Sequence, residues 1–113
     1  MPHIAVPEGV PGIRSLVLFR PDTGKHLYDL VQILLRDASP LTAAERELIA
    51  AHVSAKNNCS FCRDSHAAAA RELYGDQRAV VDGVMNDVSD VSISDKMKAL
   101  LTIAVKFNTV ANR

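Results

Sequence analysis

Residues 41–75 read LTAAERELIAAHVSAKNNCSFCRDSHAAAARELYG, and this stretch carries signals for the start and the end of helices. Thr42 and Glu45 have the spacing of a capping box, in which each side chain binds a backbone amide at the start of a helix. We expect that helix to run to about Lys56. A second helix follows the cysteines, and Gly75 is well placed to end it because glycine tolerates a left-handed conformation. The stretch therefore predicts two consecutive helices with a short connection.

The prolines separate this helical part of the chain from the part that precedes it. All five prolines lie in the first forty positions, and none follows Pro40. Because proline is excluded from helix interiors, we expect an extended arm over residues 1–21, in which the run 16–19 is compatible with a strand or a helical turn. Further helices are expected to begin after Asp22-Thr23, at Asp76 and at Ser94-Asp95.

These elements predict the fold class, since strand signals are nearly absent. We expect an all-α protein, a compact helical bundle of about five helices. A length of 113 residues is that of a single domain, which we assign to residues 1–113, with residues 22–113 as its helical core.

Composition and charge exclude several classes of protein. Hydrophobic residues make up 48% of the chain, which argues against disorder, and 13 basic residues balance 13 acidic ones. A neutral chain lacks the clustered basic excess that binds nucleic acids or membrane surfaces. No apolar run approaches the ~20 residues that span a bilayer, and residues 1–10 lack the pattern of a secretory signal. We therefore expect a cytoplasmic protein without nucleic-acid or membrane partners.

The two cysteines, Cys59 and Cys62, are too close together to connect distant parts of a fold. In a reducing compartment such a pair is typical of redox-active or metal-binding sites. Asn57-Asn58 favours a break between helices, which puts Cys59 at or near a helix start, where unpaired N–H groups stabilise a thiolate. Cys62 lies about one turn further on, so the two sulfurs can meet in a disulfide. His66 follows Cys62 by four residues on the same helix face, and its imidazole can take the thiol proton.

Glu47 adds a carboxylate to this group. Its neighbours on a helical wheel are all small, which lets another helix approach closely: Ala43, Ala44, Ala50, Ala51, Ser54 and Asn58. The carboxylate is therefore expected in a tight interface, where it can take part in proton transfer. In a simple helix hairpin, however, Glu47 lies ~18 Å from Cys59 along the chain, against ~10 Å from Cys59 to His66. We expect the carboxylate to overshoot His66, so that a bridging water, a bend or another subunit has to connect them.

Glu47, eleven intervening residues, Cys59-x-x-Cys62, three more residues and then His66 form a pattern at fixed spacing. This pattern resembles the active site of the AhpD-like alkylhydroperoxidases, which belong to the carboxymuconolactone decarboxylase superfamily. The resemblance is densest from about Leu41 to Leu73, and the surrounding phrase is similar to the peroxidase-related members. It implies an AhpD-like core, present once in this chain, and the activity of an antioxidant thiol peroxidase. The muconolactone decarboxylases proper lack the cysteine pair, so the resemblance does not imply decarboxylation.

The resemblance also implies a role for each residue of the pattern. Cys62 is the peroxidatic thiol that attacks the peroxide and becomes a sulfenic acid, and Cys59 resolves it to a disulfide. A separate, unidentified thiol reductant reopens that disulfide, while His66 and Glu47 form the proton relay. The best-known members carry a relay histidine just before the second cysteine, where this chain has Phe61. The resemblance implies neither a metal nor an organic cofactor, and it implies assembly into a homo-oligomer, a trimer or hexamer.

Other interpretations of the same residues stay open. The cysteines can be inert buried thiols, or they can serve a non-catalytic, oligomeric redox-sensing module. They can also stabilise a structural domain through zinc, with Cys59, Cys62 and His66 as three ligands and His52 or Glu47 as the fourth. We expect His52 instead to be a hydrogen-bonded packing residue, because it lies on an apolar helix face away from Glu47.

The segment Ala99–Val110 is apolar over much of its circumference, with Lys106 as the main interruption. A monomer of this size would struggle to cover such a surface. We therefore expect a subunit interface there; a fragment whose next helix is missing is the alternative.

Overall fold

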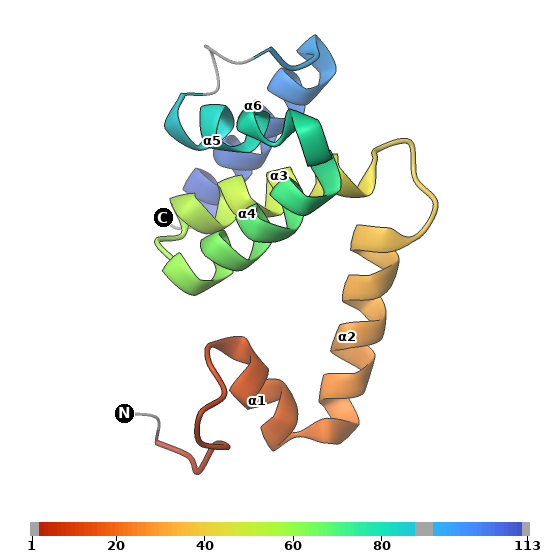
Figure 1. The fold of residues 1–113 in the computed structure, drawn as a ribbon. Helices are drawn as coiled ribbons and strands as arrows, with labels where there is room; N and C mark the ends of the chain where they lie inside the picture. The colour runs from red at the N-terminus through yellow and green to blue at the C-terminus, as the bar shows by residue number, and fades with distance from the viewer. Residues whose placement is uncertain (1–2, 88–91, 112–113) are drawn as a thin grey trace. The chain divides into compact units, whose positions relative to one another are not determined.

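The centre of the fold is a pair of antiparallel helices. The structure is a computed structural model and describes residues 3–87 and 92–111. Helix α3 spans Ala43–Lys56 and helix α4 spans Ser60–Tyr74, and Figure 1 shows them side by side, joined by a short turn. These are the two consecutive helices that residues 41–75 predict.

Local interactions set the ends of both helices. The Thr42 hydroxyl accepts a hydrogen bond from the Glu45 N–H at 3.1 Å, and the Glu45 carboxylate accepts one from the Thr42 N–H at 2.8 Å, so the capping box is confirmed. Asn58, in the turn between the helices, has a φ of 56°, a left-handed conformation that asparagine tolerates. Gly75 ends α4 with a φ of 55°, as the sequence predicts.

The described residues form six α-helices and one short 3₁₀-helix without any strand, so the all-α class is confirmed. The extended arm expected over residues 1–21 is wrong in part, because helix α1 spans Ile13–Phe19 and raises the helix count. Helix α2 follows directly, at Pro21–Arg36, with its proline in the first turn, where the missing N–H has no partner to lose. The prolines therefore bracket α1 instead of excluding it. None of the described helices is both long and apolar enough to cross a membrane.

The chain divides into two compact units, residues 1–38 and residues 39–113. In the first unit, α1 packs against α2. The two helices come close at Gly24, where a Cβ atom would collide with the carbonyl oxygen of Val17, so this position of α2 requires glycine. The assignment of all 113 residues to one domain stays a prediction.

The second unit holds the core that anchors α3 and α4. Helix α5, Ala79–Asn86, packs against both of these helices, and helix α6, Asp95–Ala111, packs against α3 (Figure 1). The largest fully buried side chains come from α3, α5 and α6: Leu48, Val81, Val84 and Leu101. The buried residues of α3 and α4 include the alanines Ala51, Ala67 and Ala70, whose small side chains let the two helices approach closely.

The helix expected to begin at Asp76 begins three residues later. Residues Gly75–Gln77 form a 3₁₀ turn, in which the Arg78 N–H donates to the Gly75 carbonyl at 3.1 Å. Asp76 lies inside this turn and does not cap α5, because Arg78 is the residue that precedes the helix. Ser94 fits its expected role, since its hydroxyl accepts a hydrogen bond from the Met97 N–H at 3.2 Å at the start of α6.

Candidate functional site

The two cysteines lie at the start of α4 and are joined by a disulfide. Cys59 is the residue just before the helix and Cys62 occupies its first turn, with their Cα atoms 5.4 Å apart. The Sγ atom of Cys59 accepts a hydrogen bond from the backbone N–H of Cys62 at 3.3 Å. Cys59 therefore caps α4 through its sulfur, at the helix start where the sequence predicts it.

This position sets the electrostatic environment of both sulfurs. The first N–H groups of a helix have no partner within the helix, and together with the helix dipole they stabilise negative charge. In the reduced protein, a cysteine at this position forms a thiolate more readily than a cysteine on an exposed loop does. Cys59 and Cys62 are both half-buried, so part of each remains accessible from water.

His66 lies one turn beyond Cys62 and is hydrogen-bonded to Glu47 on α3. Its Nδ1 atom is 2.6 Å from Glu47 Oε2. An ionised carboxylate can only accept a hydrogen bond, so the Nδ1–H of His66 donates to Glu47. The Glu47 side chain is 3% exposed and that of His66 is 32% exposed. The imidazole therefore connects a buried carboxylate to the accessible side of α4.

Cys62 and His66 are four residues apart on one continuous helix. Side chains with this spacing share a helix face, with their Cβ atoms about 6 Å apart. Helix α4 brings Cys59, Cys62 and His66 together, and the pairing of α3 with α4 adds Glu47 to this group. The catalytic roles given to these four residues stay predictions.

The contact between Glu47 and His66 is direct, so the expected overshoot of the carboxylate is wrong. That expectation counted residues 57–59 as helical rise, whereas they form a turn that adds no length along either helix axis. Counted from the helix ends, Glu47 lies about 13 Å and His66 about 9 Å from the turn. Two long side chains span the remaining offset, and this hydrogen bond needs no bend, water or second subunit.

Small residues on α3 make room for this contact. Ala44, Ala51 and Ser54 are buried on the same helix as Glu47, which is itself 2% exposed. The Ser54 hydroxyl donates to the Ala50 carbonyl at 2.7 Å, so it is satisfied within its own helix and does not compete for the carboxylate. The tight interface expected around Glu47 is therefore confirmed.

His52 is buried, as the sequence predicts, but its surroundings differ from the expected ones. Its ring borders a cavity, and among the described residues the ring makes no hydrogen bond. The expected hydrogen bond is absent because the facing side chains of α5 and α6 leave a space beside the ring. The sequence carries no periodic signal of this cavity, because its lining residues come from three different helices.

The zinc interpretation requires a cluster of ligands. Over residues 3–87 and 92–111, no three histidine, cysteine, aspartate or glutamate side chains are arranged to hold a metal ion. Cys59 and Cys62 are bonded to each other, and Nδ1 of His66 is engaged by Glu47. In this disulfide form the ligand set of the zinc alternative is not assembled among the described residues.

Comparison with known protein families identifies the family of this chain. The model of the carboxymuconolactone decarboxylase family matches residues 21–106, from the start of α2 into α6. The chain therefore belongs to the carboxymuconolactone decarboxylase family, which includes AhpD-like proteins. No curated protein and no solved structure gives a significant match.

Proposed function

We propose that this protein is a thiol-dependent hydroperoxide reductase that cycles Cys59 and Cys62 between dithiol and disulfide. The observation that carries the proposal is the cysteine pair at the start of α4, with a buried carboxylate hydrogen-bonded to His66 one turn further on. Family membership leaves the reaction open, because the family includes decarboxylases as well as alkylhydroperoxidases. A thiol pair beside an imidazole base is suited to peroxide reduction and has no evident use in decarboxylation.

The first half of the proposed cycle oxidises Cys62. In the reduced protein, Nε2 of His66 takes the thiol proton, and Glu47 stabilises the imidazolium that forms. The Cys62 thiolate attacks one peroxide oxygen, the O–O bond breaks, and the sulfur becomes a sulfenic acid. The leaving alkoxide takes the proton held by His66 and departs as an alcohol, or as water when the substrate is hydrogen peroxide.

The second half closes and reopens the disulfide. The Cys59 thiol attacks the sulfenic sulfur of Cys62, an S–S bond forms, and the sulfenic oxygen leaves as water. A dithiol reductant then supplies the two electrons and two protons that restore both thiols. The cysteines are three positions apart at a helix start, so both sulfurs stay within reach throughout the cycle.

Phe61, half-buried just before Cys62, carries no exchangeable side-chain proton. The proposed relay therefore runs through His66 and Glu47 alone. In the proposed mechanism, the Cys62 thiol is connected to the buried Glu47 carboxylate through His66 and its hydrogen bond to Glu47.

Peroxide consumption by the reduced protein, measured with several dithiol and monothiol reductants, tests the proposed cycle. Cys62→Ser is expected to abolish turnover, and Cys59→Ser is expected to accumulate a sulfenic acid that dimedone traps. Ser60→Ala, at an exposed position between the cysteines, is the matched control and should behave as the wild type. Consumption by Cys62→Ser at the wild-type rate would contradict the mechanism. Reversible disulfide formation with slow turnover under every reductant would favour the redox-sensing module.

The relay is tested in the same assay by Glu47→Gln, which preserves size and removes the negative charge. Without that charge the imidazolium is less stable, so Cys62 oxidation should slow by about tenfold or more and its pH profile should change. Glu72→Gln, at an exposed position on α4, is the control for loss of a carboxylate. An unchanged rate and pH profile in Glu47→Gln would remove this residue from the relay.

A further inference from the structure

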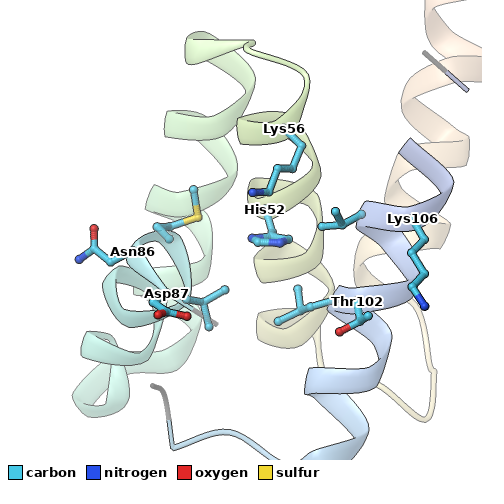
Figure 2. Close-up of a pocket in the computed structure, with 10 residues that line it drawn as sticks. His52, Lys56, Asn86, Asp87, Thr102 and Lys106 are labelled. Carbon is cyan, nitrogen blue, oxygen red and sulfur yellow. The ribbon is translucent and has the colours of Figure 1, made fainter. Parts of the chain in front are cut away.

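A cavity of about 450 Å³ lies between α3, α5 and α6, apart from the cysteine pair (Figure 2). Its apolar wall includes Val84 from α5 with Leu101 and Val105 from α6. Figure 2 shows His52 among the lining side chains, with Lys56 one turn further along α3 and Thr102 on α6. A cavity of this size, mostly apolar with a few polar groups, has the character of a small-molecule site.

The buried polar group of this cavity is His52, which is 6% exposed. No fully buried side-chain N or O atom in the described residues lacks a hydrogen-bond partner, and the His52 ring makes no hydrogen bond there, so its nitrogens must open onto the cavity. Burial, and after it the positive charge of Lys56, lowers the pKa of His52 below its ordinary value of 6.5. This shift favours the neutral ring, which offers one N–H donor to whatever occupies the cavity.

The charges around the cavity favour an anion. Lys56 follows His52 by four residues on α3, and Lys106 follows Thr102 by four residues on α6, so each lysine shares a face with a polar lining residue. Asp87, just after α5, is the carboxylate among the described lining residues, and two ammonium groups outnumber it. An anionic head group near Lys56 and His52 would receive charge-assisted hydrogen bonds.

We propose that this cavity binds a small carboxylic acid with an apolar tail. The tail would lie against Val84, Leu101 and Val105, and the carboxylate would accept hydrogen bonds from the His52 ring N–H and the Lys56 ammonium. A compact anion such as phosphate would leave the apolar wall uncovered, and a neutral apolar molecule would leave the His52 donor without a partner. This binding requires neither cysteine and does not rest on the proposed peroxidase activity.

Calorimetric titration of the oxidised protein tests the ligand class. The probes are octanoate and 3-phenylpropionate, with 1-octanol and inorganic phosphate for comparison. At least one carboxylate should bind saturably, octanol should bind about tenfold more weakly because it lacks the charge, and phosphate should not bind. The imidazole NMR signals of His52 should shift on carboxylate binding. Binding of octanol as tight as that of octanoate, or no binding of either carboxylate, would overturn the proposal.

Variants then locate the binding. Lys56→Gln should weaken carboxylate binding about tenfold, while Lys96→Gln, at an exposed position on α6 outside the cavity, should leave it unchanged. Val105→Trp should abolish binding by filling the cavity. Thr102→Phe fills the cavity from an exposed position. It replaces the tryptophan variant if circular dichroism shows that the tryptophan variant is unfolded. Binding that survives a folded cavity-filling variant would overturn the proposal. Cys62→Ser should bind normally, which separates this site from the thiol chemistry.

Discussion

Helix α3 buries two polar side chains, Glu47 and His52, in different environments. Glu47 is 2% exposed and is hydrogen-bonded to His66, so its burial is compensated within the protein. His52 is 6% exposed and opens onto a cavity, with no hydrogen bond to a described residue. The two side chains lie five positions apart on one helix, and only that of Glu47 has a described hydrogen-bond partner.

Protonation of His52 is expected to destabilise the folded protein. Burial and then the Lys56 charge lower its folded pKa below the ordinary 6.5, so the unfolded chain takes up this proton at a higher pH than the folded chain does. The stability is therefore full well above pH 6.5 and decreases as the pH falls through 6.5 towards the folded pKa. The other charged groups at the cavity are Lys106 from α6 and Asp87 after α5.

Urea unfolding between about pH 8 and pH 5 measures this effect. The free energy of unfolding should fall less steeply with decreasing pH in His52→Gln than in the wild type. His26→Gln, at an exposed position on α2, is the matched control and should keep the wild-type slope. Equal slopes for His52→Gln and the wild type would show that His52 is not the group that titrates.

Among the elements, α3 depends on its capping box for a defined start. Thr42→Ala removes the acceptor of the Glu45 N–H, and we expect the free energy of unfolding to fall by about 1 kcal/mol. Thr42→Ser keeps the hydroxyl and should stay close to the wild type in the same urea titration. A loss in the serine variant as large as that in the alanine variant would mean that the methyl group, and not the cap, stabilises α3.

The ends of α3 and α4 could be predicted because the residues that set them are local. Thr42 and Glu45 start one helix and Gly75 ends the other without help from distant parts of the chain. The helix α1 could not be predicted in the same way, since its contact with α2 at Gly24 depends on tertiary packing. Aspartate is a common helix N-cap, but Asp76 lies in a 3₁₀ turn. The hydrogen bond that closes this turn, from the Arg78 N–H to the Gly75 carbonyl, cannot be inferred from the residue type alone.

In the candidate site too, local features could be predicted from the sequence and tertiary contacts could not. The grouping of Cys59, Cys62 and His66 follows from helical spacing within α4, and it could be predicted from sequence. The direct hydrogen bond from His66 to Glu47 could not, because it depends on how far α3 and α4 are offset along their axes. The cavity beside His52 was missed because three helices form it, and their packing leaves no periodic trace in the sequence.

On the scale of the whole molecule, α6 leaves an apolar stripe uncovered. Ile103, Phe107 and Val110 are 50%, 75% and 72% exposed, and their spacing of four and three residues places them on one helix face. Exposed apolar patches of this kind mark interaction surfaces in proteins that stay in solution. We propose that this stripe mediates the self-association expected for residues 99–110.

Phe107→Glu is therefore expected to reduce the assembly to a smaller species, because a charge in the middle of the stripe disfavours its burial. Size-exclusion chromatography with light scattering measures the mass directly. Thr109→Glu adds the same charge at an exposed position on the other side of α6, and it should leave the mass unchanged. A wild-type protein that is already monomeric, or an unchanged mass in Phe107→Glu, would contradict the proposal.

The disulfide at the start of α4 joins residues only three positions apart, and Glu47 and His66 are separated by nineteen. Contacts between residues close in sequence form early, because little chain entropy is lost in closing a short loop. The cysteines can therefore meet in an unfolded or nascent chain, before α5 and α6 cover the core. A count of free thiols during refolding would consequently report the redox state of the pair and not the progress of folding, for which the contact between Glu47 and His66 is the better indicator.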